Sequence, residues 1–147
     1  MSKSSVLAFA LVGLVLGCNS RPGAPKASET RAATEPQLSE LSVPQVASAL
    51  KDKRAVVVDA NNPETRQRYG VVPGAVLLTD HRSYALTELP KDKAQPLVFY
   101  CGGTQCRASD AAATRAASAG YASVSVMRDG IRGWVNAGQP TTSAPSS

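Results

Sequence analysis

The 147-residue chain has few aromatic side chains, few charges and no apolar run long enough to cross a membrane. Aromatic residues make up 5% of it and charged residues 18%, and no basic run is interleaved with aromatics, so we expect no nucleic-acid partner. In the central part of the chain, one histidine, His81, and two cysteines, Cys101 and Cys106, do not make a complete zinc ligand set, so we expect no metal site. Hydrophobic residues make up 43%, which is enough for the core of one ordinary domain.

An apolar stretch near the N-terminus has the pattern of an export signal. Lys3 gives a positive start, and residues 6–16 carry no charge but are too short to cross a hydrocarbon core of about 30 Å. Residues 15–18 (VLGC) then resemble the bacterial lipoprotein box, in which the cysteine receives a lipid. The resemblance implies a signal peptide over residues 1–17 and an exported protein held on the bacterial cell envelope through a lipid on Cys18. The alternative is a secretory signal that happens to end in cysteine.

The residues on either side of the central region cannot contribute to a core. Residues 19–37 contain no Leu, Ile, Val or aromatic residue, so with Cys18 they form a predicted flexible tether over 18–37. Residues 141–147 are similar in composition and are predicted to be a disordered tail, which leaves 38–140 as the folded domain. Asn19 is not the aspartate that resembles an inner-membrane retention signal, which favours the periplasmic side of the outer membrane if the cell has one.

Short apolar runs alternate with helical stretches within the folded domain. The runs suit strands buried on both faces and cover residues 56–58, 75–78, 97–100 and 124–126. Helices are predicted over 44–51, 63–69 and 108–119, with Asn62 as an N-cap and with Gly70 and Gly120 as stops. This alternation predicts an α/β fold with a mainly parallel sheet flanked by helices. Ligands of such sheets bind beyond the carboxyl ends of the strands, which directs attention to the loop after Tyr100.

That loop, residues 101–107 (CGGTQCR), is here called the cysteine loop. Gly102 and Gly103 allow its backbone N–H groups to turn inward as an anion-binding nest. Arg107 and the N-terminus of the following helix add positive charge. Because these features lower a thiol pKa from its free value of about 8.5, they predict a nucleophilic Cys101. The structural alternative is a small buried apolar residue.

Five landmarks in the right order then resemble the rhodanese family of single-domain sulfurtransferases, over nearly all of residues 38–140. They are Val56–Asp59, Tyr69–Ala75, Phe99–Cys101, Gly120-Tyr121, and Asp129–Trp134 together with Ala137–Pro140. The resemblance implies a rhodanese-like fold and a persulfide on Cys101, with no cofactor because the cysteine itself carries the sulfur. It also implies a role for Asp59 in orienting nearby loop amides, a supporting position for Ser109, and a substrate-binding loop made of Gly102, Gly103, Thr104, Gln105, Cys106 and Arg107.

The cysteine loop departs from the common family pattern. Cys101 and Ser109 are separated by seven residues, where the family usually has five, so we expect a wider or differently shaped pocket. Cys101 and Arg107 also fit the Cys-x5-Arg signature of cysteine phosphatases, and longer loops in the superfamily accompany phosphate or arsenate. Against a phosphatase or an arsenate reductase, Tyr100 stands where those enzymes usually have His, Ala108 replaces Ser or Thr, and no general acid is evident.

Cys106 is a second thiol in the same loop. Disulfides persist outside the cytosol, so Cys101 and Cys106 could pair, either structurally or after Cys106 attacks a Cys101 persulfide and releases sulfide. Cys106 could equally remain unpaired. Our hypothesis is that Cys101 takes sulfur from thiosulfate or a similar small anionic donor, which Arg107 binds, and passes it to a thiophilic acceptor. The alternative is a binding or redox-sensing module that uses the two cysteines without transferring sulfur.

Other polar residues have no predicted role in chemistry. We expect Arg66, Arg128 and Arg132 to cover the surface, and Asp80 and Glu88 to be solvated. We expect Trp134 to pack in the core.

Overall fold

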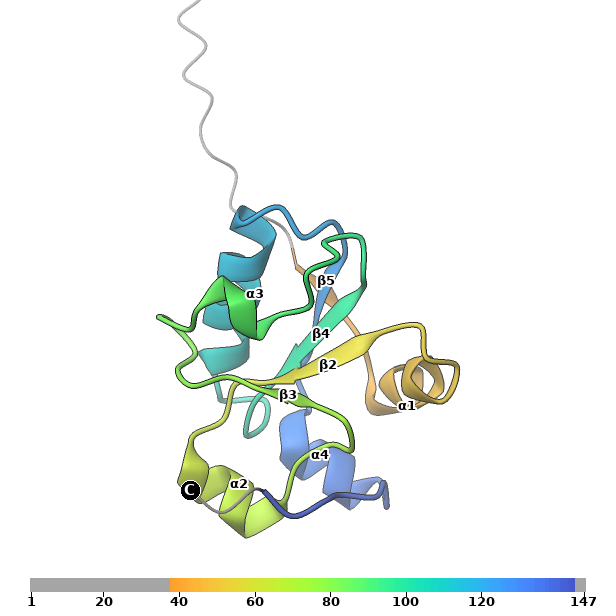
Figure 1. The fold of residues 1–147 in the computed structure, drawn as a ribbon. Helices are drawn as coiled ribbons and strands as arrows, with labels where there is room; N and C mark the ends of the chain where they lie inside the picture. Colours follow the sequence, from red (N-terminus) through yellow and green to blue (C-terminus); the bar gives the residue numbers. More distant parts are fainter. Residues whose placement is uncertain (1–37, 145–147) are drawn as a thin grey trace, which may run out of the picture. The chain divides into compact units, whose positions relative to one another are not determined.

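The structure, a computed structural model, describes residues 38–144 (Figure 1). The predicted signal peptide, Cys18 and the predicted tether up to residue 37 lie outside the described residues. Residues 38–144 contain a five-stranded parallel sheet with helices on both faces, which confirms the predicted α/β fold. Within this range no helix is long and apolar enough to span a membrane.

The strands and helices alternate along most of the chain. The strands are β1 (Ser39–Glu40), β2 (Val56–Asp59), β3 (Val76–Leu77), β4 (Leu97–Tyr100) and β5 (Val124–Met127), in the spatial order β1-β5-β4-β2-β3. The helices are α1 (Val43–Lys51), α2 (Pro63–Tyr69), α3 (Ala108–Ser118) and α4 (Gly130–Asn136), with a short 3-10 helix, η1 (Leu86–Glu88). The order places β4 between β2 and β5 at the centre of the sheet, so the cysteine loop starts from its middle strand.

The central strand β4 is buried on both faces, which explains its unbroken apolar sequence. Phe99 packs in one core cluster with Ala112 of α3, and Tyr100 packs in the other with Ile131 and Trp134 of α4. Alternate residues of β4 therefore contact helices on opposite sides of the sheet. Trp134 is 2% exposed and lies in the core as predicted.

Local capping explains the accurately predicted helix α2. Its N-cap residue Asn62 accepts a hydrogen bond from the Thr65 backbone N–H at 2.9 Å, and Pro63 opens the first turn. The helix stops at Gly70, whose φ of 74° is unfavourable for other residues. Predicted strand and helix positions elsewhere agree to within one residue at each end. The prediction missed β1, η1 and α4, which are short and lack a clear periodic pattern.

Pro140 and Thr142, which follow α4, are hydrogen-bonded to the rest of the domain. Trp134 Nε1 donates a hydrogen bond to the Pro140 carbonyl at 2.8 Å, and Val71 and Thr142 form an antiparallel bridge. The bridge has two backbone hydrogen bonds of 2.9 Å. Thr142, which falls in the predicted tail, is therefore hydrogen-bonded to the segment that follows α2.

Candidate functional site

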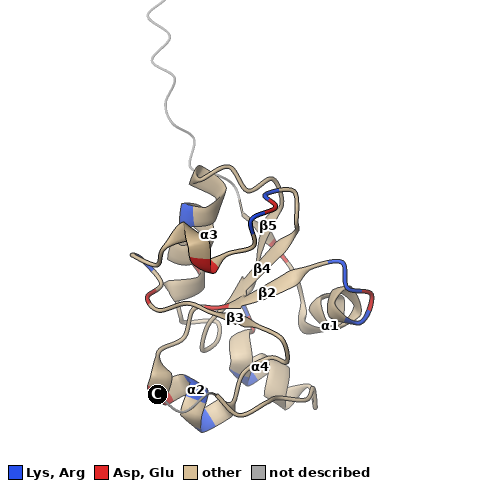
Figure 2. Cartoon of the chain, in the orientation of Figure 1, with Lys and Arg blue, Asp and Glu red and all other residues tan. Residues whose placement is uncertain are grey.

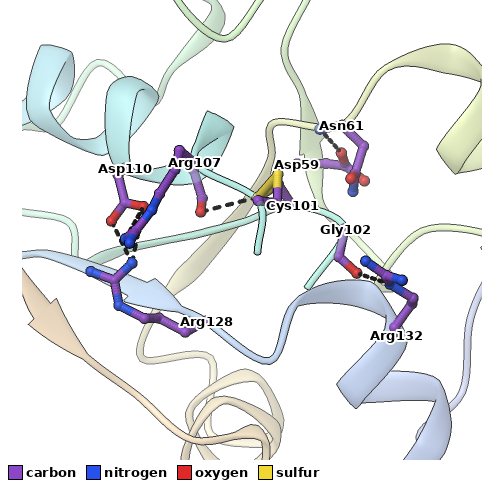
Figure 3. Close-up of a disulfide and its surroundings, with 10 residues drawn as sticks. Asp59, Asn61, Cys101, Gly102, Arg107, Asp110, Arg128 and Arg132 are labelled. Atoms are coloured by element: carbon purple, nitrogen blue, oxygen red, sulfur yellow. Dashed lines mark hydrogen bonds and ion pairs between the residues drawn. A yellow bond between two sulfur atoms is a disulfide. The ribbon is translucent and has the colours of Figure 1, made fainter. Parts of the chain in front are cut away.

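The cysteine loop lies at the carboxyl edge of the sheet, between β4 and α3. Cys101 follows β4 directly and is 2% exposed. Ser109, in the first turn of α3, is equally buried, and its Oγ lies 3.3 Å from Cys101 Sγ (Figure 3). The structure thus brings together the predicted nucleophile and the predicted supporting serine.

Cys101 and Cys106 are joined by a disulfide bond, with their Cα atoms 6.2 Å apart. Between them the chain makes a turn in which the Cys106 N–H donates to the Gly103 carbonyl at 2.8 Å. Thr104 and Gln105, at the tip of this turn, are exposed. Of the alternatives that the sequence left open, the structure therefore shows the paired form.

The backbone of the cysteine loop is fixed by the start of α4. The Ile131 N–H donates to the Cys101 carbonyl at 2.8 Å, and Arg132 Nε donates to the Gly102 carbonyl at 2.9 Å. Gly130 makes this close approach possible, because a Cβ at this position would lie only 2.5 Å from the Gly103 nitrogen. Its φ of 62° is also a conformation that favours glycine.

Asp59 is fully buried at the end of β2 and accepts hydrogen bonds on both carboxylate oxygens. Oδ1 accepts from the Asn61 N–H at 2.7 Å and from Arg66 Nε at 3.2 Å, and Oδ2 accepts from the Tyr100 hydroxyl at 2.5 Å. The Tyr100 hydroxyl in turn accepts from the Val72 N–H at 3.1 Å. Burial and the Asp59 carboxylate raise the pKa of Tyr100, so its hydroxyl keeps its proton and donates to Asp59.

Our expectation that Arg66 covers the surface was wrong. Its side chain is only 11% exposed, and besides pairing with Asp59 it donates to the backbone carbonyls of Asp59 and Leu78, at 3.0 and 2.9 Å. The reason is that Arg66 in α2 reaches the carbonyl of Asp59, the last residue of β2, and the carbonyl of Leu78, which directly follows β3. The guanidinium group therefore connects these two strand ends.

Two arginines lie on opposite sides of Cys101 (Figure 3). Arg107 is 76% exposed and pairs with Asp110 at 3.6 Å, and Asp110 also binds Arg128 at 2.8 Å. Arg132 contacts the loop itself through the Gly102 carbonyl. We expected Arg132 to be a surface residue without a role at the site; it is exposed, but it is part of the loop's immediate surroundings.

A cleft of about 270 Å³ opens beside Gly102 between α2 and α4. Basic residues lie on both helices (Figure 2), and the cleft is lined by Glu64, Thr65, Arg68, Tyr69, Gly102 and Arg132. A larger cavity of about 470 Å³ lies between α2 and residues 141–144 and includes no residue of the cysteine loop. Within residues 38–144 no cluster of His, Cys, Asp and Glu is suited to hold a metal ion.

Asn61 adds a buried donor to this region. The residue is 8% exposed, and its Nδ2 has no hydrogen-bond partner among the described residues. Its Oδ1 would lie 3.8 Å from a Cβ placed on Gly102, so the amide borders the loop (Figure 3). Asn61 was not among the predicted site residues; its position two residues after a strand end, where ligands of parallel sheets bind, was the available signal.

Comparisons with known proteins agree with this architecture. A family model described as a rhodanese-like domain matches residues 42–137. A thiosulfate sulfurtransferase from Pseudomonas aeruginosa aligns with a TM-score of 0.61 and 23% identity, over 74% of this chain and 21% of that one. A Rhodopseudomonas palustris protein of unknown function, described as a possible tyrosine phosphatase, aligns with a TM-score of 0.58 and 25% identity, over 71% and 85% of the two chains. No curated protein sequence matches the chain.

Proposed function

Because the chain belongs to the rhodanese-like family, we propose that it is a sulfurtransferase that carries sulfane sulfur as a persulfide on Cys101. The observation that carries the proposal is the position of Cys101. It follows the central strand of a parallel sheet, where ligands of α/β proteins bind, and its sulfur lies 3.3 Å from the Ser109 hydroxyl. A hydroxyl at this distance can donate to a thiolate or a persulfide sulfur.

The reaction starts from the reduced protein, which an external thiol produces by exchange with the disulfide. The Cys101 thiolate attacks the outer sulfur of thiosulfate, the sulfur–sulfur bond of the donor breaks, and sulfite leaves with the electron pair. Cys101 then holds a persulfide. A thiophilic acceptor attacks the outer sulfur, and Cys101 leaves as a thiolate, ready for another donor.

We place the anionic end of the donor in the cleft beside Gly102. Arg132 and Arg68 line this cleft, and the Asn61 amide, whose Nδ2 has no hydrogen-bond partner among residues 38–144, borders the same loop residue. Guanidinium and amide N–H groups are suitable donors for sulfonate oxygens. This assignment replaces Arg107 as the donor-binding arginine, since Arg107 is directed to Asp110 instead.

The ion pair between Arg107 and Asp110 also argues against the phosphatase alternative. Cysteine phosphatases need the arginine of their Cys-x5-Arg signature on the bound phosphate, whereas Arg107 is 76% exposed and paired with Asp110. A phosphate ester would also need a general acid. Hydrolysis of an aryl phosphate or reduction of arsenate by the reduced protein would revive this alternative.

We also propose that the domain is held on the bacterial cell envelope by a lipid on Cys18, on the periplasmic side of the outer membrane if the cell has one. The support is the resemblance of residues 15–18 to the lipoprotein box. Metabolic labelling with a fatty acid tests it: the expected label on the wild-type protein disappears in Cys18→Ser. A label that persists in Cys18→Ser would contradict the proposal.

The test of sulfur transfer uses the reduced full-length chain carrying Cys18→Ser and Cys106→Ser, so that Cys101 is its one thiol. We expect thiosulfate to release one sulfite per chain and to add about 32 Da, the mass of one sulfur atom. Cyanide, as a thiophilic acceptor, should remove this mass as thiocyanate. The matched control carries Cys101→Ser as well and should gain nothing. If the protein that keeps Cys101 gains no sulfur either, it is not a thiosulfate sulfurtransferase, and the binding or redox-sensing alternative is favoured.

A further inference from the structure

We infer that Cys106 resolves the Cys101 persulfide, so that the protein reduces thiosulfate to sulfite and sulfide with electrons from an external dithiol. The inference rests on the proposed function, because it needs the persulfide. It adds the identity of the group that attacks this persulfide, and it assigns sulfide as the released product.

The shape of the cysteine loop supports this role. The Cys106 N–H donates a hydrogen bond to the Gly103 carbonyl, and the turn that this bond closes brings the chain back towards Cys101. Cys106 Sγ thereby reaches the Sγ atom of Cys101 closely enough to bond with it. The two residues by which this loop exceeds the usual family spacing lie in the same segment, between Cys101 and Ser109.

The bond in the structure corresponds to the product of attack by Cys106 on the inner sulfur of the persulfide. In a Cys101 persulfide, Cys101 Sγ is the inner sulfur and the transferred atom is the outer one. Attack by the Cys106 thiolate on the inner sulfur forms the observed disulfide, breaks the bond to the outer sulfur and expels it as hydrosulfide with the electron pair. Because both thiols belong to one short loop, this attack competes well with any external acceptor.

The cycle closes by thiol–disulfide exchange with a dithiol. Cys106 is partly exposed whereas Cys101 is 2% exposed, so the incoming thiolate reaches Cys106 first. Cys101 then leaves as a thiolate beside the Ser109 hydroxyl. The second thiol of the dithiol releases Cys106 and forms a disulfide in the reductant. Over one cycle, thiosulfate and one dithiol give sulfite, hydrogen sulfide and one oxidised dithiol, so atoms and electrons balance.

The experiment is a single turnover without external thiol, because a free thiol would release sulfide from any persulfide. Full-length Cys18→Ser protein is reduced, freed of reductant under exclusion of oxygen, and mixed with an equal amount of thiosulfate. Sulfite, sulfide, free thiols and intact mass are measured. The matched variant carries Cys106→Ser in addition, and its sulfite release shows that it is folded and active.

We expect the protein with both loop cysteines to give one sulfite and one sulfide per chain, to lose both thiols, and to end about 2 Da lighter than its reduced form, as a disulfide. The Cys106→Ser variant should give sulfite without sulfide and remain about 32 Da heavier. Sulfite without sulfide from both proteins would overturn the resolving role and leave the proposed sulfurtransferase intact. No sulfite from either protein would overturn the proposed function itself.

Discussion

Replacing Tyr100, the residue before Cys101, by Phe tests whether the Tyr100 hydroxyl stabilises the fold without taking part in the chemistry of Cys101. The substitution keeps the buried ring and removes the hydroxyl that donates to Asp59 and accepts from the Val72 N–H. A hydrogen bond to a charged group contributes about 1.5–3 kcal/mol, and a buried N–H left without an acceptor costs about 1–3 kcal/mol. Asp59 keeps its bonds from Asn61 and Arg66, so we expect a total loss of about 3 kcal/mol in the free energy of unfolding.

The matched control is Tyr84→Phe. Tyr84 is also fully buried, but its hydroxyl donates to a neutral acceptor, the Ala112 carbonyl, at 2.8 Å, so its loss should cost about 1 kcal/mol. Urea unfolding of both variants at neutral pH, with the disulfide intact, measures the difference. Persulfide formation on Cys101 should survive Tyr100→Phe, since the Tyr100 proton stays in place at neutral pH. A Tyr100→Phe variant no less stable than Tyr84→Phe, or a folded one that no longer accepts sulfur, would refute the reasoning.

Three further changes probe the site. Arg132→Gln should raise KM for thiosulfate about tenfold, the equivalent of about 1.4 kcal/mol in binding free energy. Arg107→Gln should leave KM near its wild-type value. Equal effects of the two substitutions in steady-state kinetics would contradict our placement of the donor. Gly130→Ala should displace the cysteine loop and lower the free energy of unfolding by about 3 kcal/mol in urea titrations, because its methyl group overlaps the loop backbone; a cost below about 1 kcal/mol would argue against that contact. Ser109→Ala should slow alkylation of reduced Cys101 by iodoacetamide about fivefold at neutral pH, because it removes a hydrogen bond to the sulfur of about 1 kcal/mol. An unchanged rate would exclude the hydrogen bond between Ser109 and Cys101.

The parts of the fold that sequence could predict are those with strong local signals. The buried run Leu97–Tyr100 and the capped helix Pro63–Tyr69 have the predicted bounds, because burial on both faces and capping are visible in the sequence. Helix α4 lacks such signals. Its position depends on close packing of Gly130 against the cysteine loop, which is a tertiary contact.

The candidate site shows the same limit. The sequence located the cysteine loop and Ser109 and indicated Arg107 as the cation of that loop, but it did not indicate that Arg132 lines the cleft beside the loop. Arg132 and Asn61 are distant in sequence and meet the loop only because β2 and β4 end, and α4 begins, at the same edge of the sheet. Proximity along the chain is therefore a poor guide to which arginine faces the cleft.

The two-residue strand β1 has a consequence for how the domain behaves when it is shortened. The family match begins at residue 42, but Ser39 and Glu40 already pair with β5, and the Leu41 N–H donates to the Val126 carbonyl at 3.0 Å. A chain that starts at residue 42 would leave the outer backbone groups of β5 without partners. Unpaired strand edges recruit strands from other molecules. Such a shortened protein should associate and precipitate, because Ser39, Glu40 and Leu41 cover this edge of β5.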